Sequence, residues 1–91
     1  MRAKKTTLQS LLGDVVAERR AALRLNQDEF GEKCGLHRTF ISRVERGVQS
    51  VGLDSLAKLA TGLSISMTEL VAAIERAQRD QEIIQRALAK R

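Results

Sequence analysis

The sequence has no proline, tyrosine or tryptophan and only two phenylalanines, so aromatic residues make up 2% of the chain. Strands favour aromatic and β-branched side chains, whereas the apolar residues here are mostly leucine and alanine, which favour helices. The one cysteine, Cys34, cannot form a disulfide within the chain, and one cysteine with one histidine is too small a ligand set for structural zinc. We therefore expect an all-α protein without a metal or other cofactor.

Long apolar runs are also missing. No run approaches the roughly 18 residues of a membrane span, and residues 1–10 contain no apolar segment of signal-peptide length. The sequence also shows no glycine-rich phosphate loop and no set of nucleophile, base and orienting group. We expect these 91 residues to form one cytoplasmic domain that is not an enzyme, stays outside membranes and has no evident small-molecule substrate.

Charge is present in excess of one sign and is unevenly distributed. The net charge is +5, and residues 1–50 hold ten Lys and Arg against six Asp and Glu, whereas residues 51–91 hold six against five. The first half is therefore the better candidate for contact with a polyanion.

Apolar residues at spacings of three and four predict five helices. The first covers residues 8–24. Asn26 followed by Glu29 indicates a capping box for a second helix over 27–34, which Gly35 ends. A third covers 38–46 with His37 at its start, and a fourth covers 53–62. Ser66 and Glu69 indicate a fifth that continues to the C-terminus.

The same pattern predicts what these segments do. We expect a flexible basic arm over residues 1–7, a domain over 8–74 and a C-terminal helical extension over 75–91. In the fourth helix the residues expected to be buried are Leu53, Leu56, Leu59 and Ala60.

The second and third helices are short and are separated by a tight turn that contains glycine. Such a pair describes a helix-turn-helix, in which the first helix braces the second and the second presents a polar face to the DNA major groove. The segment resembles the phage-repressor and Cro-type helix-turn-helix family, also called the XRE family. The matching residues are Arg20, Asn26-Gln27, Gly35-Leu36, Arg38-Thr39, Ile41-Ser42 and Glu45-Arg46-Gly47, followed by LDSLAKLATGLSIS.

The resemblance implies a five-helix, lambda-repressor-like fold and a role for individual residues. Arg38, Thr39 and Arg43 stand where the family reads base edges, and arginine and threonine suit guanine and thymine. Arg20 and Glu45 resemble the family's internal ion pair; the alternative is that Arg20 or Arg19 is free and faces phosphate. Contacts to the DNA backbone are expected from Asn26, Gln27, His37, Ser42 and Arg46.

The resemblance also implies a homodimer that meets through the fifth helix, at Leu70, Val71 and Ile74, with Ile84 and Leu88 extending the seam. One recognition helix covers only a few base pairs, so two coupled half-sites about 10 bp apart would supply specificity. The alternative for the last residues is a solvated extension that caps the bundle. Within the family, HRTFISRVERG is similar to small controller proteins of restriction–modification systems.

The sequence departs from the family pattern in one loop. Residues 48–52 carry no Lys or Arg, where family members often have basic residues. The arm residues Arg2, Lys4 and Lys5 offer a substitute contact, in the minor groove or along the DNA backbone, or they form a solvated tail.

The function predicted is a sequence-specific transcriptional regulator that binds a near-palindromic operator in double-stranded DNA as a homodimer. The rival hypothesis is a small helical protein-interaction module, or an antitoxin, whose C-terminal helix binds a partner protein. The exposed face of the third helix distinguishes the two.

Overall fold

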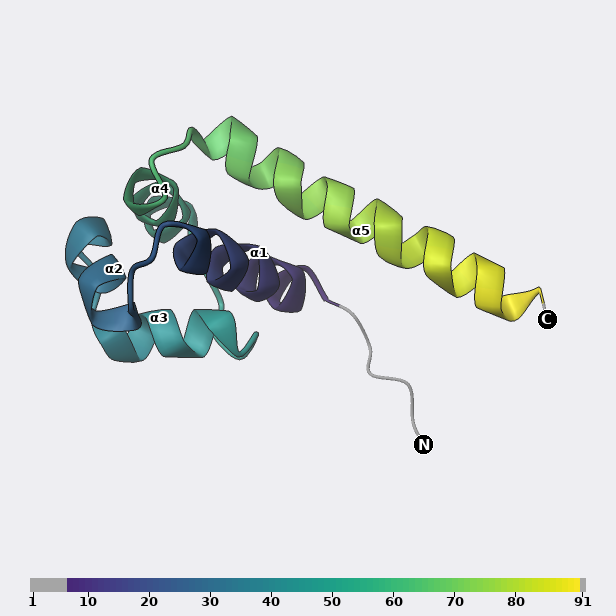
Figure 1. Ribbon diagram of the computed structural model, residues 1–91, viewed down its shortest axis with the longest axis horizontal. Helices are drawn as coiled ribbons and strands as arrows, with labels where there is room; N and C mark the ends of the chain where they lie inside the picture. The colour runs from purple at the N-terminus through teal and green to yellow at the C-terminus, as the bar shows by residue number, and fades with distance from the viewer. Residues whose placement is uncertain (1–6, 91) are drawn as a thin grey trace.

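The computed structural model of this protein describes residues 7–90, which form five α-helices and no strand (Figure 1). In chain order these are α1 (Leu8–Ala22), α2 (Gln27–Cys34), α3 (Arg38–Glu45), α4 (Leu53–Gly62) and α5 (Met67–Ala89). The predicted all-α, five-helix fold is confirmed. The predicted basic arm, with Arg2, Lys4 and Lys5, lies outside the described residues.

Local hydrogen bonds at the start of four helices explain where those helices begin. The side chains of Asn26 and Ser66 each accept a hydrogen bond from the backbone N–H of a glutamate three residues later. The carboxylate of that glutamate accepts one from the backbone N–H of the cap residue, which completes the two predicted capping boxes. Thr7 caps α1 through one bond, since its hydroxyl oxygen accepts from the backbone N–H of Ser10. His37 caps α3, since its Nδ1 accepts from Thr39 N–H at 3.0 Å. Only α4 begins without a side-chain cap, at Gly52.

Two helices end earlier than the sequence pattern predicts. α1 stops at Ala22 rather than residue 24, because the chain turns into the left-handed region at Arg24, with φ of 60°. α3 stops at Glu45, one residue early, and Gly47 then takes a φ of 73°. Gly35 ends α2 in the left-handed conformation, as expected.

The core is apolar and draws on all five helices. α1 packs against α3 and α5, α2 against α3 and α4, and α4 against α5. The largest fully buried side chains are Val16, Phe30, Ile41, Val44, Leu59 and Leu70. This arrangement fixes α3 between α1 and α2 and leaves its outer face free.

One expected core residue is exposed. Leu53, predicted to be buried, is 73% exposed, whereas Leu59 and Ala60 of the same helix are buried and Leu56 is half-buried. Leu53 is the first residue of α4 and lies one turn before the part of the helix that packs. Apolar periodicity alone does not show where along a helix packing begins.

The last helix is longer than the bundle that it covers. Figure 1 shows α5 running over α1 and then past it, and every residue from Gln78 to Lys90 is exposed. The predicted boundary at residue 74 falls inside this unbroken helix. Within residues 7–90, no single helix is long and apolar enough to span a membrane; α4 and α5 pass that test only jointly, across a bend of 96°.

Candidate nucleic-acid interface

The interface candidate is the outer face of α3, which the three-residue turn Gly35, Leu36, His37 sets against α2. Ile41 and Val44 point into the core at 0% and 1% exposure. Residues on the opposite side, Arg38, Thr39 and Arg43, are exposed. α3 therefore buries one stripe and presents the other to solvent, as a helix that enters a DNA groove must.

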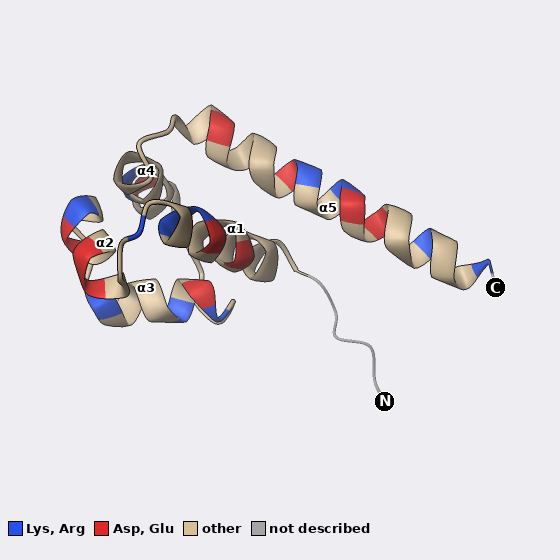
Figure 2. Ribbon diagram, viewed as in Figure 1, with Lys and Arg blue, Asp and Glu red and all other residues tan. Residues whose placement is uncertain are grey.

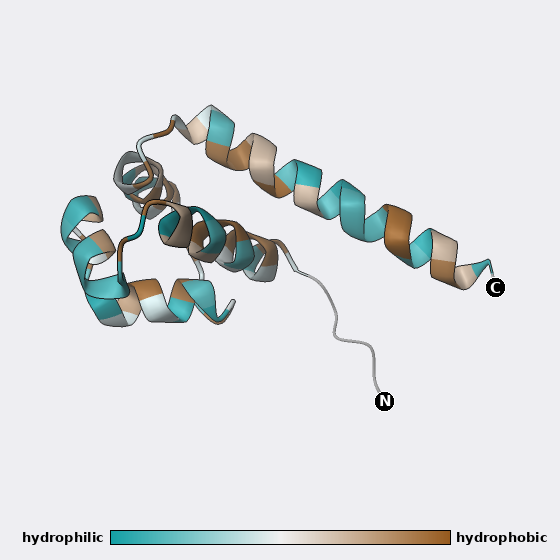
Figure 3. Ribbon diagram, in the orientation of Figure 1, coloured by the Kyte–Doolittle hydropathy of each residue, from teal (hydrophilic) through white to brown (hydrophobic). Residues whose placement is uncertain are grey.

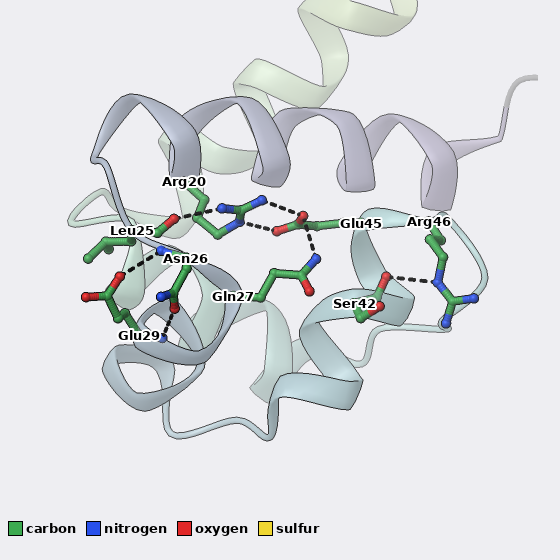
Figure 4. A network of polar contacts seen from close by, with 8 residues as sticks. All are labelled: Arg20, Leu25, Asn26, Gln27, Glu29, Ser42, Glu45 and Arg46. Carbon is green, nitrogen blue, oxygen red and sulfur yellow. Dashed lines mark hydrogen bonds and ion pairs between the residues drawn. The ribbon is translucent and has the colours of Figure 1, made fainter.

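A network of charge-assisted hydrogen bonds holds α3 against α1 (Figure 4). Arg20 Nε lies 2.6 Å from Glu45 Oε2, and Arg20 Nη2 donates to Glu45 Oε1 at 3.0 Å. The Glu45 hydrogen bond raises the pKa of the Arg20 guanidinium, outweighing the opposite effect of burial. The expected pair is therefore present, and it compensates the negative charge of Glu45 beside the exposed face of α3.

The same network reaches the loop before α2. Arg20 Nη1 donates to the carbonyl oxygen of Leu25 at 2.7 Å, and Gln27 Nε2 donates to Glu45 Oε1 at 3.1 Å. Gln27, predicted to contact DNA backbone, is half-buried and uses its amide N–H in this network. Three elements thus meet at Glu45, and the position of α3 relative to the start of α2 is fixed.

Arg43 is held by a residue that sequence reasoning missed. Its Nε donates to Gln49 Oε1 at 3.0 Å, and its Nη2 donates to the carbonyl oxygen of Val48 at 3.3 Å. Gln49 in turn donates from Nε2 to the carbonyl oxygen of Ser50 at 2.9 Å. No sequence motif marks Gln49; only the path of the loop brings it to Arg43.

Arg38 also has a neighbour that was not expected. Its Nε lies 3.8 Å from Asp28 Oδ1, and the two side chains are 64% and 67% exposed. Solvent screens a pair this exposed, so it contributes little to stability. Figure 2 shows acidic and basic residues close together on α2 and α3, and the Asp28 carboxylate lies beside the face that carries Arg38.

The other predicted backbone contacts lie around the starts of α2 and α3 and at the end of α3. Asn26 and His37 are exposed, but each already uses one side-chain acceptor as a helix cap. Ser42 is half-buried, and its carbonyl oxygen accepts from exposed Arg46 Nε at 3.4 Å (Figure 4). The helix starts add backbone N–H groups and a partial positive charge, which favour phosphate.

The residues predicted to meet a second copy differ in accessibility. Leu70 is completely buried in the core of its own chain, so its side chain is not open to a partner. Val71 is 39% exposed, and Ile74 is half-buried. Both line a surface groove of about 480 Å³ between α1, the start of α4 and α5. Leu70 therefore supports the position of α5, and the accessible part of the predicted interface is this groove.

Residues 7–90 contain no group of three His, Cys, Asp or Glu side chains placed to hold a metal ion. Burial raises the pKa of the Cys34 thiol to about 11, which disfavours the reactive thiolate.

Comparison with known proteins places this geometry in context. Residues 16–70 match the family described as Helix-turn-helix, HTH_3. Control protein C.BamHI of Bacillus amyloliquefaciens is 32% identical over 65 residues, covering 70% of this chain and 80% of that protein. Control protein C.SmaI of Serratia marcescens is 36% identical over 64 residues, covering 70% and 76%. The crystal structure of the restriction-modification controller protein C.AhdI from Aeromonas hydrophila is 37% identical, with a TM-score of 0.65, and the match covers 68% of this chain and 94% of that one.

Proposed function

Because the chain belongs to the HTH_3 helix-turn-helix family, we propose that it is a transcriptional regulator that binds a near-palindromic operator in double-stranded DNA as a homodimer. The family is one of DNA-binding regulators and not of enzymes. The similarity to control proteins of restriction–modification systems supports a controller role of the same kind. In this proposed role the protein acts in the cytoplasm, carries out no catalysis and uses no cofactor.

The observation that carries the proposal is the exposed stripe of α3 on a helix whose other side is locked into the core. A major groove admits one α-helix. Arg38 and Arg43 can each donate two hydrogen bonds to guanine O6 and N7, and the Thr39 methyl can meet a thymine methyl. We assign base readout to these three residues.

Contacts to phosphate complete the proposed interface and set its register. We assign them to Asn26, Gln27, His37, Ser42 and Arg46, which surround the readout face. Asn26 and His37 use their acceptor atoms as helix caps, so Asn26 Nδ2 and His37 Nε2 stay available to donate to a phosphate oxygen. The Arg46 guanidinium is a third donor. The arm over residues 1–7 is a further candidate. In the proposed domain plan, residues 8–74 form the DNA-binding domain, which includes the predicted dimer-interface residues Leu70, Val71 and Ile74, and residues 75–91 form a C-terminal helical extension.

Selection of bound duplexes from a random pool tests the proposal. The expected result is enrichment of one sequence with two-fold symmetry, whose half-sites lie about 10 bp apart, one helical turn. Failure to enrich any duplex, with the folded chain instead capturing a partner protein, would favour the interaction-module hypothesis. Enrichment of a single half-site would contradict the dimeric part.

A further inference from the structure

The projecting half of α5 carries an apolar ridge that has nothing to cover it within its own chain. Apolar side chains recur along one face of α5 at spacings of three and four, at Met67, Leu70, Ile74 and Ala77 and again at Ile84 and Leu88, with Gln81 interrupting the series. The first four pack against the bundle, but Ile84 is 53% exposed and Leu88 is 58% exposed. Figure 3 shows that hydrophobic segments continue along α5 beyond the bundle. An isolated helical segment this short is marginal in water, so packing elsewhere would stabilise it.

The bundle also offers a groove that matches such a ridge. The groove beside the first half of α5 has a volume of about 480 Å³, and its apolar lining consists of Leu8, Leu12, Val51, Leu56, Val71 and Ile74. Leu8 at its edge is 58% exposed. Glu75 also lines the groove, and the projecting half of α5 is nearly balanced in charge, with Arg79, Arg86 and Lys90 against Asp80 and Glu82.

We propose that each α5 of the homodimer extends across to the other protomer and packs its ridge, Ile84 and Leu88, into that protomer's groove. This inference rests on the proposed homodimer and specifies how it assembles. A two-fold interface is reciprocal, so one chain that supplies both a ridge and a groove satisfies both contacts at once. Antiparallel α5 helices bring the projecting half of each beside the first half of the other. The 13 exposed residues from Gln78 to Lys90 span about 20 Å at 1.5 Å per residue.

Sedimentation velocity on the full chain tests the ridge. The double substitution Ile84→Glu and Leu88→Glu is expected to raise the dimer dissociation constant at least about tenfold, because each buried apolar side chain stabilises association and each occurs twice. The matched control is Ile83→Glu, since Ile83 is 63% exposed but lies roughly 100° around α5 from Ile84 and therefore off the ridge; its dimer is expected to match the wild type. Circular dichroism checks that all chains are folded. An unchanged dimer in the double variant, or equal weakening by Ile83→Glu, would overturn the proposal.

Mixing two variants tests whether the contact is an exchange. A groove variant, Leu8→Glu with Val71→Glu, is expected to associate as weakly as the ridge variant. Their mixed dimer keeps one intact ridge and one intact groove on opposite chains, so the mixture is expected to associate more tightly than either variant alone. Absence of this complementation would contradict the exchange, and a groove variant that associates as tightly as the wild type would show that the ridges pair with each other instead.

DNA binding by the wild type separates this inference from the function on which it rests. If the wild type binds a symmetric duplex while the ridge variant stays dimeric, the exchange is wrong and the regulator stands. If the ridge and groove behave as expected but no duplex is bound, the exchange stands and the regulator is wrong.

Discussion

Arg43 stands at the proposed DNA surface already oriented by its neighbours. Gln49 Oε1 and the Val48 carbonyl oxygen accept from its guanidinium at 3.0 and 3.3 Å. A flexible arginine that is held in this way loses less side-chain entropy on binding, so Gln49 acts as a positioning residue for Arg43. The loop over residues 48–52, which has no Lys or Arg, thus contributes to the proposed DNA surface through the Gln49 amide and the Val48 carbonyl oxygen, which orient Arg43.

We predict that Gln49→Ala weakens operator binding about three- to tenfold, which corresponds to roughly one hydrogen bond of about 1 kcal/mol. The same substitution in an Arg43→Ala background is expected to have almost no further effect, because its target is gone. Titration of one labelled operator with the wild type, the two single variants and the double variant measures the coupling between Gln49 and Arg43. Equal losses in both backgrounds would mean that Gln49 acts independently of Arg43.

Cys34 provides a prediction on pH. Burial raises the pKa of its thiol from 9.0 to about 11, so the folded chain holds this proton more tightly than the unfolded chain. The resulting stabilisation is complete below about pH 9 and is lost as the pH rises toward 11. Urea unfolding across this range should therefore show a steeper decline for the wild type than for Cys34→Ala. Parallel declines would contradict the assignment.

At the scale of helices, the sequence was most informative where a structure depends on residues three or four apart. The capping boxes at Asn26 and Ser66 and the bounds of α2 and α4 follow from such local signals. Contacts between elements were less predictable. The Arg20–Glu45 pair followed from the family pattern, whereas Gln49 beside Arg43 and Asp28 beside Arg38 depend on how loops and helices meet in space. The exposure of Leu53 has the same origin, since it depends on which neighbours reach the end of α4.

Gly13 illustrates a contact between helices that sets the position of α3. A Cβ atom at Gly13 would lie 2.4 Å from the carbonyl oxygen of Val44 and 2.9 Å from that of Glu45. Both atoms belong to the backbone of α3, so relief would require the two helices to separate.

We predict that Gly13→Ala lowers the free energy of unfolding by roughly 1–3 kcal/mol, because the overpacking outweighs the better helix propensity of alanine. Gly52→Ala is the matched control, since nothing lies within 4 Å of a Cβ there, and its cost at a helix cap is expected to be about 0.5 kcal/mol. Thermal and urea unfolding measure both. Equal stabilities would show that α1 and α3 have room to move apart.

At the scale of the whole molecule, shape and charge distinguish a part suited to DNA from a part suited to association. The described residues extend over 46 × 27 × 25 Å, and the long axis reflects α5 projecting past the bundle (Figure 1). The excess of Lys and Arg lies in residues 1–50 and comes mostly from Arg2, Lys4 and Lys5, which precede the described residues, whereas residues 51–91 are nearly balanced. The balanced half is suited to association and the basic half to a polyanion.

Salt dependence follows from this division. If the dimer contacts about six to ten phosphates, its affinity for the operator should fall by about 10³–10⁵ between 50 and 200 mM salt, because bound counterions are released from DNA. Fluorescence anisotropy over a salt series measures the slope. A flat response would contradict a phosphate-based footprint, whereas dimer formation through apolar α5 contacts should change little over the same range.

The central claim is that the outer face of α3 reads base edges. The most direct test compares the affinities of wild type, Arg38→Ala and Arg43→Ala for the operator and for each single base change in it. Arg79→Ala, which removes an equally charged and exposed side chain from α5, is the control. We predict that each α3 variant loses about 1–3 kcal/mol and loses its preference at one base position in each half-site, while the control keeps the wild-type profile. Retention of the full base preference by both α3 variants would contradict the claim.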